Sequence, residues 1–244
     1  MESNEPPITS ALWTACQEGE LERAQQLVKK FGVTRDEARS KNNLALRIAC
    51  KDGHLTLAQW LVEEFALTVE DARANCNGAL RGACMKGHLE IAQWLVRKFE
   101  LTAEDARAIN NRTLNLSCAY GHLEIAQWLV RKFELTAEDA RANCNSALRD
   151  ACLHGHLEIA QWLAQTFELT TKDARAVNSW ALRLSCAQGH LEVAQWLVHK
   201  FELTAEDARA EDNWALRYTC KNDHLVVAQW LEQTFNITEA ELKE

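Results

Sequence analysis

Six cysteine–histidine pairs are the residues of this 244-residue chain whose spacing most suggests chemistry. In each pair the cysteine stands four residues before the histidine, as in "CKDGH", "CMKGH" and "CAYGH", and the last pair reads "CKNDH". Thiolate and imidazole bind zinc, but a zinc site needs four ligands within about 2.0–2.3 Å of one ion. The pairs recur every 34 residues, and helical layers lie about 10 Å apart. We therefore expect no metal site and no cofactor.

Arginine and tryptophan recur at the same interval. The arginines could bind phosphates or peptide carboxylates, but we expect them to pair with the acids of the nearby "AED" motif and to bond loop carbonyls. The tryptophans could stack on bases, but their place in the most apolar segment favours packing between layers. The columns are Arg39, Arg73, Arg107, Arg141, Arg175 and Arg209; Arg47, Arg81, Arg149, Arg183 and Arg217; and Trp60, Trp94, Trp128, Trp162, Trp196 and Trp230.

The sequence has no Ser–His–Asp order, no glycine-rich phosphate loop and no isolated pair of carboxylates. We therefore expect no catalytic residues and no enzyme. The net charge of -8 makes nucleic acid an unlikely partner, because phosphate neutralisation needs a basic surface. No apolar run approaches the roughly 20 residues of a membrane span, and "MESNEPPITS" lacks the features of a secretory signal. We expect a cytoplasmic protein that does not enter a membrane.

The cysteines point to a reducing compartment. Seven of the nine fall at strict 34-residue intervals from Cys16 to Cys220. Layers about 10 Å apart hold such cysteines too far apart for disulfides, which need Cα atoms within about 7 Å. We expect buried, reduced thiols in this column. Cys76 and Cys144 lie outside the column, two layers apart, and should not bond to each other.

The elements that position these residues belong to a 34-residue repeat. We predict a lead at 1–8 and one repeat domain at 9–244, and we expect a monomer. The domain would begin with a half repeat at 9–18. It would continue with full repeats at 19–52, 53–86, 87–120, 121–154, 155–188 and 189–222 and end with a capping repeat at 223–244.

Three helices are predicted in each repeat. "HLEIAQWLVRKF" is apolar around most of its circumference, which predicts a helix buried on most sides. "TAEDARA" predicts a short helix, because Thr102 and Asp105 are spaced as a capping box. The third helix, such as "ALRDACLH", ends at the repeat's glycine. Its predicted N-caps are Thr9, Asn43, Asn77, Asn111, Asn145, Ser179 and Asn213.

The two ends of the array differ from its middle. Gln26 replaces the tryptophan of later repeats, Glu20 replaces their histidine, and Glu232 replaces an apolar residue. The tail "ITEAELKE" is acidic and polar. Because terminal repeats expose one face to water, we expect the array to begin and end within this chain.

The stretch "NSALRDACLHGHLEIAQWL" resembles an ankyrin repeat, whose helix pair follows T-P-L-H-x-A-A-x-x-G-H-L-E-V-V-x-x-L-L. The resemblance covers about residues 9–235, and the matching residues are Leu148, Ala151, Gly155, His156, Leu157, Glu158, Ile159 and Leu163. It is nearest to the divergent arrays of protists and large DNA viruses. Ankyrin repeats have an alanine in the core where this chain has its cysteine, and their Gly-His pair begins a helix. The resemblance therefore implies structural roles for the cysteine–histidine pairs.

Two departures from the family alter the predicted fold. The Thr-Pro pair is absent, and "ELTAEDARA" has no turn signal where the family forms a β-hairpin. We predict an all-α, right-curved α-solenoid of about seven stacked ankyrin-like repeats, with a short third helix in place of the hairpin. Tetratricopeptide repeats share the 34-residue period, but their tryptophan, tyrosine and proline spacing is missing.

Variation between repeats indicates where a partner would bind. Residues 87–108 and 121–142 are identical, whereas the 12 residues after each copy agree at three positions. The changing positions precede, lie on and end the third helix, and the resemblance implies that this face lines a concave groove. The aromatics among them are typical of interface hot spots. The predicted groove residues are Arg112, Leu116, Tyr120, Asp150, His154, Trp180, Leu184, Gln188, Trp214, Tyr218 and Lys221.

We therefore predict a non-enzymatic module that binds a protein or peptide through this groove. Two alternatives are open. One is a single-stranded nucleic-acid reader with one base per repeat, as in other helical repeats. The other is a structural array with no dedicated ligand, which the nearly verbatim repeats suggest.

Overall fold

The computed structural model describes residues 7–237, which fold into helices and connecting turns with no strand. The predicted all-α class is confirmed. The first six residues and the acidic tail from residue 238 lie outside the described residues. The helices are α1 (Pro7–Glu18), α2 (Leu21–Phe31), α3 (Arg35–Ala38), α4 (Ser40–Lys51), α5 (Leu55–Glu64), α6 (Val69–Met85), α7 (Leu89–Lys98), α8 (Ala103–Ala119), α9 (Leu123–Phe133), α10 (Ala137–Leu153), α11 (Leu157–Thr166), α12 (Thr171–Ala174), α13 (Ala176–Ala187), α14 (Leu191–Phe201), α15 (Ala205–Lys221) and α16 (Leu225–Phe235).

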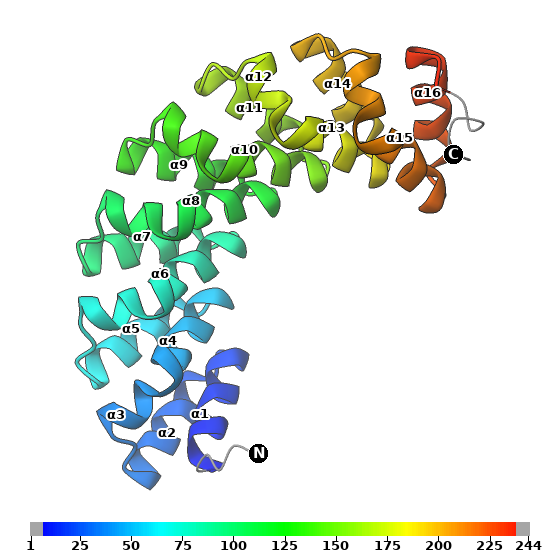
Figure 1. Cartoon of the computed structure of the whole chain (residues 1–244). Helices are drawn as coiled ribbons and strands as arrows, with labels where there is room; N and C mark the ends of the chain where they lie inside the picture. Colours follow the sequence, from blue (N-terminus) through cyan, green and yellow to red (C-terminus); the bar gives the residue numbers. More distant parts are fainter. Residues whose placement is uncertain (1–6, 238–244) are drawn as a thin grey trace. The chain divides into compact units, whose positions relative to one another are not determined.

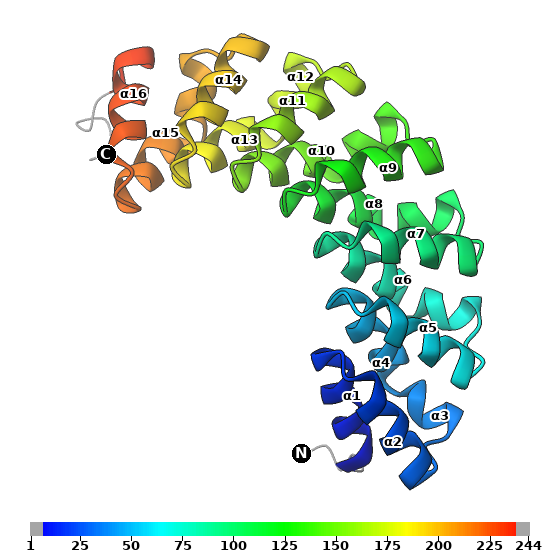
Figure 2. The same cartoon turned by 180° about the vertical axis from the view of Figure 1, so that it is seen from behind.

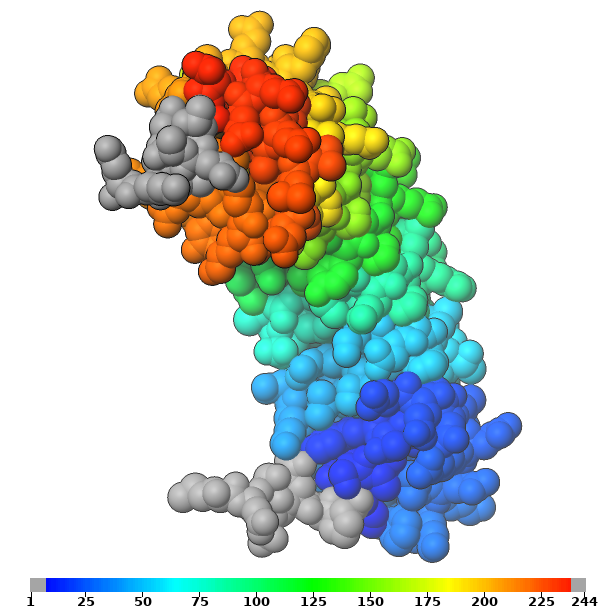
Figure 3. Space-filling model, turned by 90° about the vertical axis from the view of Figure 1, so that its right-hand side faces the viewer, coloured from blue at the N-terminus to red at the C-terminus, as the bar shows by residue number. Residues whose placement is uncertain are grey.

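The helices form two compact parts, up to Thr113 and from Leu114, with the boundary inside α8. In the N-terminal part, α1, α4 and α6 stack in one row, and α2, α5 and α7 stand beside them in a second row (Figure 1). In the C-terminal part, α10, α13 and α15 form the first row and α9, α11, α14 and α16 the second (Figure 2). Figure 3 shows the last pair, α15 and α16, packed together at the end of the C-terminal part. No helix within residues 7–237 has the length and apolar character needed to cross a membrane.

The core repeats with the sequence. Leu148, Ala151 and Cys152 on α10 and Ala160 and Leu163 on α11 each expose 1% or less of their surface. Small alanine and cysteine side chains thus alternate with large leucine side chains in the core, which allows the helices to pack closely. None of the nine cysteines forms a disulfide, and six of the seven in the column are buried, whereas Cys220 is half-buried. Burial raises the pKa of the Cys16 and Cys186 thiols to about 12, so these thiols stay protonated and pack as apolar groups.

The predicted short helix is present in all six full repeats, begun by a threonine. The Thr102 backbone N–H and hydroxyl donate to Asp105 Oδ2 at 2.9 and 3.2 Å. Equivalent bonds join Thr136 to Asp139 and Thr170 to Asp173. The predicted capping box is confirmed, because the carboxylate satisfies N–H groups that the first turn of a helix leaves without partners.

A left-handed turn of three residues follows each short helix, and the sequence analysis missed it. In α13 the turn comprises Val177, Asn178 and Ser179, with φ of 53°, 56° and 56°. In α15 it comprises Glu211, Asp212 and Asn213. Most residues other than glycine, asparagine and aspartate disfavour this conformation. The only sequence signal is the frequent asparagine in the turn, which we interpreted as a helix cap.

The cap column therefore has a different role from the predicted one. Asn43 Nδ2 donates to Asp71 Oδ1 of the next repeat at 3.0 Å, and Ser179 Oγ donates to Asp207 Oδ1 at 2.7 Å. These side chains join successive short helices, because the left-handed backbone aims them at the neighbouring repeat. Thr9 was also predicted as a cap, but it lies inside α1.

The repeat's glycine is required for two reasons. Gly155 has φ of 76°, which favours glycine. A Cβ at this position would also lie only 2.6 Å from Nδ1 of the His190 ring, too close for contact. The His190 Nε2 lies 3.1 Å from the carbonyl oxygen of Leu153, at the end of α10. The glycine and the histidine 35 residues later thus form one contact between repeats.

Candidate partner-binding surface

The predicted groove residues all reach the surface. They lie on α8, α10, α13 and α15 or at the ends of these helices, and none is buried. Arg112 belongs to the N-terminal part and the others to the C-terminal part. Trp180 is 38% exposed and Tyr120 51%. Three other varying positions, Ala119, Ser146 and Ala187, are buried. The next repeat covers Ala119 and Ala187, whose carbonyls bond His156 and Asn222.

Side chains from three successive repeats form one continuous cluster on this surface. We call it the cation–aromatic array and define it as Arg149, Trp180, Arg183, Trp214, Tyr218 and Lys221. The guanidinium carbon of Arg149 lies 5.2 Å from the Trp180 ring centroid. That of Arg183 lies between the two indoles, 5.9 Å from Trp180 and 5.3 Å from Trp214.

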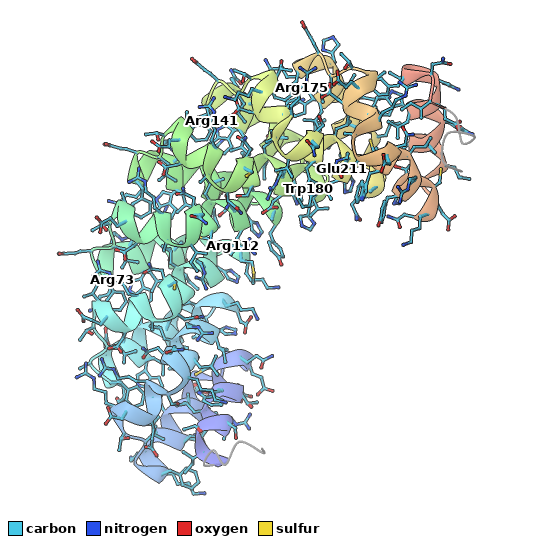
Figure 4. All side chains as sticks on the ribbon, in the orientation of Figure 1. Arg73, Arg112, Arg141, Arg175, Trp180 and Glu211 are labelled. Atoms are coloured by element: carbon cyan, nitrogen blue, oxygen red, sulfur yellow. The ribbon has the colours of Figure 1, made fainter. Side chains whose placement is uncertain are left out.

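The array continues along α15. The Trp214 and Tyr218 rings stack at 4.2 Å with an angle of 21° between their planes. Lys221 Nζ lies 5.2 Å from the Tyr218 centroid. The spacing follows from the elements, because residues three and four apart on a helix share a face. Figure 4 shows Trp180 on the α10–α13–α15 row.

Arg183 is the fixed centre of the array. Its Nε donates to the Asn178 carbonyl at 2.9 Å, and its Nη2 donates to the Val177 carbonyl at 3.0 Å. The guanidinium plane is therefore held against the left-handed turn while the indoles pack on it. Burial lowers the pKa of Arg183, yet arginine remains charged at neutral pH.

Arg149 differs from its equivalents in other repeats. Arg81 donates to the Cys76 carbonyl at 2.7 Å, as Arg183 does to its own turn. Within residues 7–237, Arg149 contacts the Trp180 ring but makes no hydrogen bond or ion pair, and Lys221 likewise contacts only the Tyr218 ring. Both ends of the array thus carry a cation whose N–H donors are available.

The sequence pattern predicts only part of this array. Trp180, Trp214, Tyr218 and Lys221 were predicted as partner-binding residues, whereas Arg149 and Arg183 were assigned structural roles. The signal that could have found them is spacing: Arg183 stands three residues after Trp180 and 31 before Trp214, and Arg149 stands 31 before Trp180.

Other predicted groove residues lie around the array. The Tyr120 and His154 rings stack at 6.3 Å, and His154 lies 6.4 Å from His156. Burial lowers the pKa of His156. Asp150, Leu184 and Gln188 are half-buried or exposed on α10 and at the end of α13.

A polar cavity of about 400 Å³ lies at the left-handed turns of α13 and α15. Asn178 Nδ2 donates to Glu211 Oε1 at its rim, at 2.5 Å, and Figure 4 marks Glu211. The lining residues are Arg175, Asn178, Ser179, Glu206, Asp207, Ala210 and Glu211. Since Arg175 pairs with Asp207, the charges left in the cavity are the acids Glu206 and Glu211.

Four arginines of the first column pair with the capping aspartates, as predicted, and Arg209 bonds the Asn236 carbonyl. Arg141 donates from Nε and Nη2 to the two Asp173 oxygens at 2.8 and 3.1 Å. Arg175 bonds Asp207 in the same way, with both distances 2.9 Å. In Figure 4 Arg141 and Arg175 lie toward the outer helices, away from Trp180. Each pair joins one repeat to the next.

The tryptophan column packs, as predicted. Trp162 meets Phe167 edge-on at 6.1 Å. It also borders a shallow cavity with Gln127 and Val130 of the preceding repeat. The ring is half-buried between two repeats, so its apolar body contributes to their contact.

The cysteine–histidine pairs do not come together as ligands. Cys152 is fully buried in the core, while the ring of His156 reaches the preceding repeat, with Nε2 3.0 Å from the Ala119 carbonyl oxygen. In the part of the chain that the structure describes, no three His, Cys, Asp or Glu side chains are grouped as a metal site requires.

Comparison with known proteins agrees with the repeat architecture. Two family models match, described as ankyrin repeats (3 copies) over residues 80–173 and ankyrin repeats (many copies) over residues 46–96. No curated protein matches the chain. The matches together span residues 46–173 and include repeats from both parts of the structure. The chain belongs to the ankyrin repeat family.

Proposed function

We propose that this protein is a non-enzymatic module that binds a protein or peptide partner through the face carrying the cation–aromatic array. Ankyrin repeats are generally protein–protein interaction modules. The observation that carries the proposal is the array itself: two tryptophans and a tyrosine from neighbouring repeats, at positions that vary between repeats. Tryptophan, tyrosine and arginine are the residues most enriched in interface hot spots.

The array is prepared for binding before a partner arrives. Arg183 is fixed by the Val177 and Asn178 carbonyls, and the indoles are held against it. Immobilising a mobile, rotamer-rich side chain on binding costs about 0.5–1.5 kcal/mol. Side chains that are already ordered avoid most of this cost. The buried cysteines, which form no disulfide, support a reducing compartment as the place of action.

The nucleic-acid alternative has less support. Four arginines of the first column pair with aspartates, namely Arg39, Arg73, Arg141 and Arg175, so their charges are not available to phosphates. In the second column, Arg47, Arg81, Arg183 and Arg217 bond turn carbonyls.

The proposal is tested by affinity capture followed by mass spectrometry. The bait is the full chain, compared with a triple variant carrying Trp180→Ala, Trp214→Ala and Tyr218→Ala. We expect proteins that the wild type retains to be lost from the triple variant, while circular dichroism shows that the helices persist. Proteins retained equally by both baits would exclude this face as the binding surface. A wild-type bait that retains nothing specific would favour the structural array with no ligand.

A further inference from the structure

We infer that the cation–aromatic array recognises an acidic peptide segment, with a carboxylate at each end and an apolar side chain between them. This inference rests on the proposed function and names its ligand class. One carboxylate would bind Arg149, the other Lys221, and the apolar side chain would lie against the edges of Trp180, Trp214 and Tyr218.

The available hydrogen-bonding groups of the array are donors, apart from the Tyr218 hydroxyl, which can also accept. Arg149 and Lys221 make ring contacts only. Trp180 and Trp214 add indole N–H groups, and Tyr218 adds a hydroxyl that can donate or accept. A ligand that matches these groups must supply acceptors, and carboxylates form the strongest hydrogen bonds with guanidinium and ammonium groups.

Charge at the array is positive although the chain carries -8. Arg149, Arg183 and Lys221 contribute three positive charges, and the Glu211 carboxylate is bonded to Asn178. Exposed charges farther than about 8–10 Å are largely screened at physiological salt. The three cations of the array therefore favour a short ligand that carries negative charge.

The ring geometry favours a peptide over a nucleic acid. Base stacking needs accessible aromatic faces, whereas Arg149 and Arg183 lie over the Trp180 ring, and Arg183 and Tyr218 lie over that of Trp214. What these rings offer a ligand is chiefly their edges, which suit aliphatic side chains and acceptor oxygens.

The span of the array sets the length of the segment. Arg149 and Lys221 stand on helices two repeats apart, which is about 20 Å at the usual packing distance between helices. An extended chain advances about 3.3 Å per residue, so the two carboxylates would be about six residues apart. We expect a pattern of two acidic residues at this separation with aliphatic residues between them.

The experiment pans a display library of random 12-residue peptides against the full chain and titrates the enriched peptides, labelled with fluorescein, by fluorescence polarisation. We expect the enriched peptides to contain more Asp and Glu than the starting library. Their affinity should fall about tenfold or more with Arg149→Ala plus Lys221→Ala. It should change less than about twofold with Arg131→Ala plus Lys132→Ala, a control that removes the same charge from exposed positions on α9.

Each failure has a different meaning. Enriched peptides without excess acid, or insensitive to the Arg149 and Lys221 changes, would overturn the acidic-ligand inference. The proposed function would still stand if those peptides are lost with the Trp180, Trp214 and Tyr218 triple variant. If no peptide is enriched, the acidic-peptide inference fails, and the proposed function is decided by the affinity capture described above. A labelled thymidine 12-mer that binds as tightly and competes with the peptides would overturn the peptide class.

Two further readouts keep the test independent of folding. Arg149→Glu should turn the preference away from acidic peptides, which simple unfolding would not do. Arg149→Lys should retain part of the affinity because the charge remains, although the planar contact with Trp180 is lost. Circular dichroism of each variant should match the wild type, since Arg149 bonds no part of its own turn.

Discussion

At the residue scale, single atoms decide which side chains the repeat tolerates. The histidine of one repeat occupies the space beside the glycine of the repeat before it, so Gly155 cannot gain a Cβ without displacing His190. The motif Gly-His is conspicuous in the sequence, and its position at a helix boundary was predicted. The contact across 35 residues was not, because spacing alone does not show which repeat a side chain reaches.

Gly155→Ala is therefore expected to destabilise the protein more than Gly32→Ala does. Both glycines have positive φ, 76° and 62°, and both changes incur the cost of a left-handed alanine, about 1 kcal/mol. Only Gly155 has a neighbour in the way, since nothing lies within 4 Å of the Cβ position at Gly32. Urea unfolding followed by circular dichroism measures both variants. Equal shifts in the midpoint would contradict the role of the histidine contact.

At the element scale, the short helix and the left-handed turn form the junction between repeats. The short helix and its capping box were predicted because threonine and aspartate stand at the required spacing. The turn was not predicted, because consecutive left-handed residues are rare in natural proteins and asparagine at this place is equally typical of a helix N-cap. Side-chain bonds support a conformation that the backbone alone disfavours, among them the arginines of four repeats that bond the turn carbonyls.

Val177→Asn is expected to stabilise the protein by about 0.5–1 kcal/mol. Val177 is exposed and β-branched at φ of 53°, whereas asparagine tolerates the left-handed region. The matched change is Asn143→Val at the equivalent exposed position, with φ of 51°, and it should destabilise by a similar amount. Differential scanning calorimetry of the two variants would show shifts of opposite sign. Shifts of the same sign would mean that the turn does not have this backbone conformation in solution.

Acid is expected to weaken the junctions between repeats. Burial opposes ionisation of Asp173, but the Arg141 guanidinium and the Thr170 N–H outweigh it and lower the pKa of this carboxyl. The pKa values of Asp71, Asp105 and Asp207 are lowered for the same reasons. A carboxyl whose pKa is lower in the folded state stabilises fully above its unfolded value, about 3.9, and loses this contribution as pH falls through the folded value.

The melting temperature should therefore hold from about pH 7 to pH 5 and fall steeply below about pH 4. Asp173→Asn should lower it at pH 7, because hydrogen bonds between charged groups contribute about 1.5–3 kcal/mol each. The same variant should lose less than the wild type on acidification, since one titrating group is gone. A pH profile with the same slope for both proteins would show that Asp173 does not titrate in this range.

At the scale of the whole molecule, most of the architecture follows from the period. Apolar spacing, the capping threonine and the final glycine sufficed to predict all-helical repeats and the absence of a hairpin. They also sufficed to predict which varying positions reach the surface, apart from Ala119, Ser146 and Ala187. Arg149 and Arg183 could not be assigned to a surface cluster, because their sequence column is shared with arginines that only bond the turn.

We propose that the partner binds to the cation–aromatic array and not to the second row of helices, α11, α14 and α16. This proposal is tested most directly by calorimetric titration of a captured partner, or of an enriched peptide, into two triple variants. One carries Trp180→Ala, Trp214→Ala and Tyr218→Ala. The other carries Gln161→Ala, Gln195→Ala and Gln229→Ala, which are exposed positions on α11, α14 and α16. We predict that the first loses at least about 30-fold in affinity, the effect of a lost hot spot of about 2 kcal/mol, while the second stays within about twofold. Equal affinities in the two variants, or a loss confined to the second, would contradict the account.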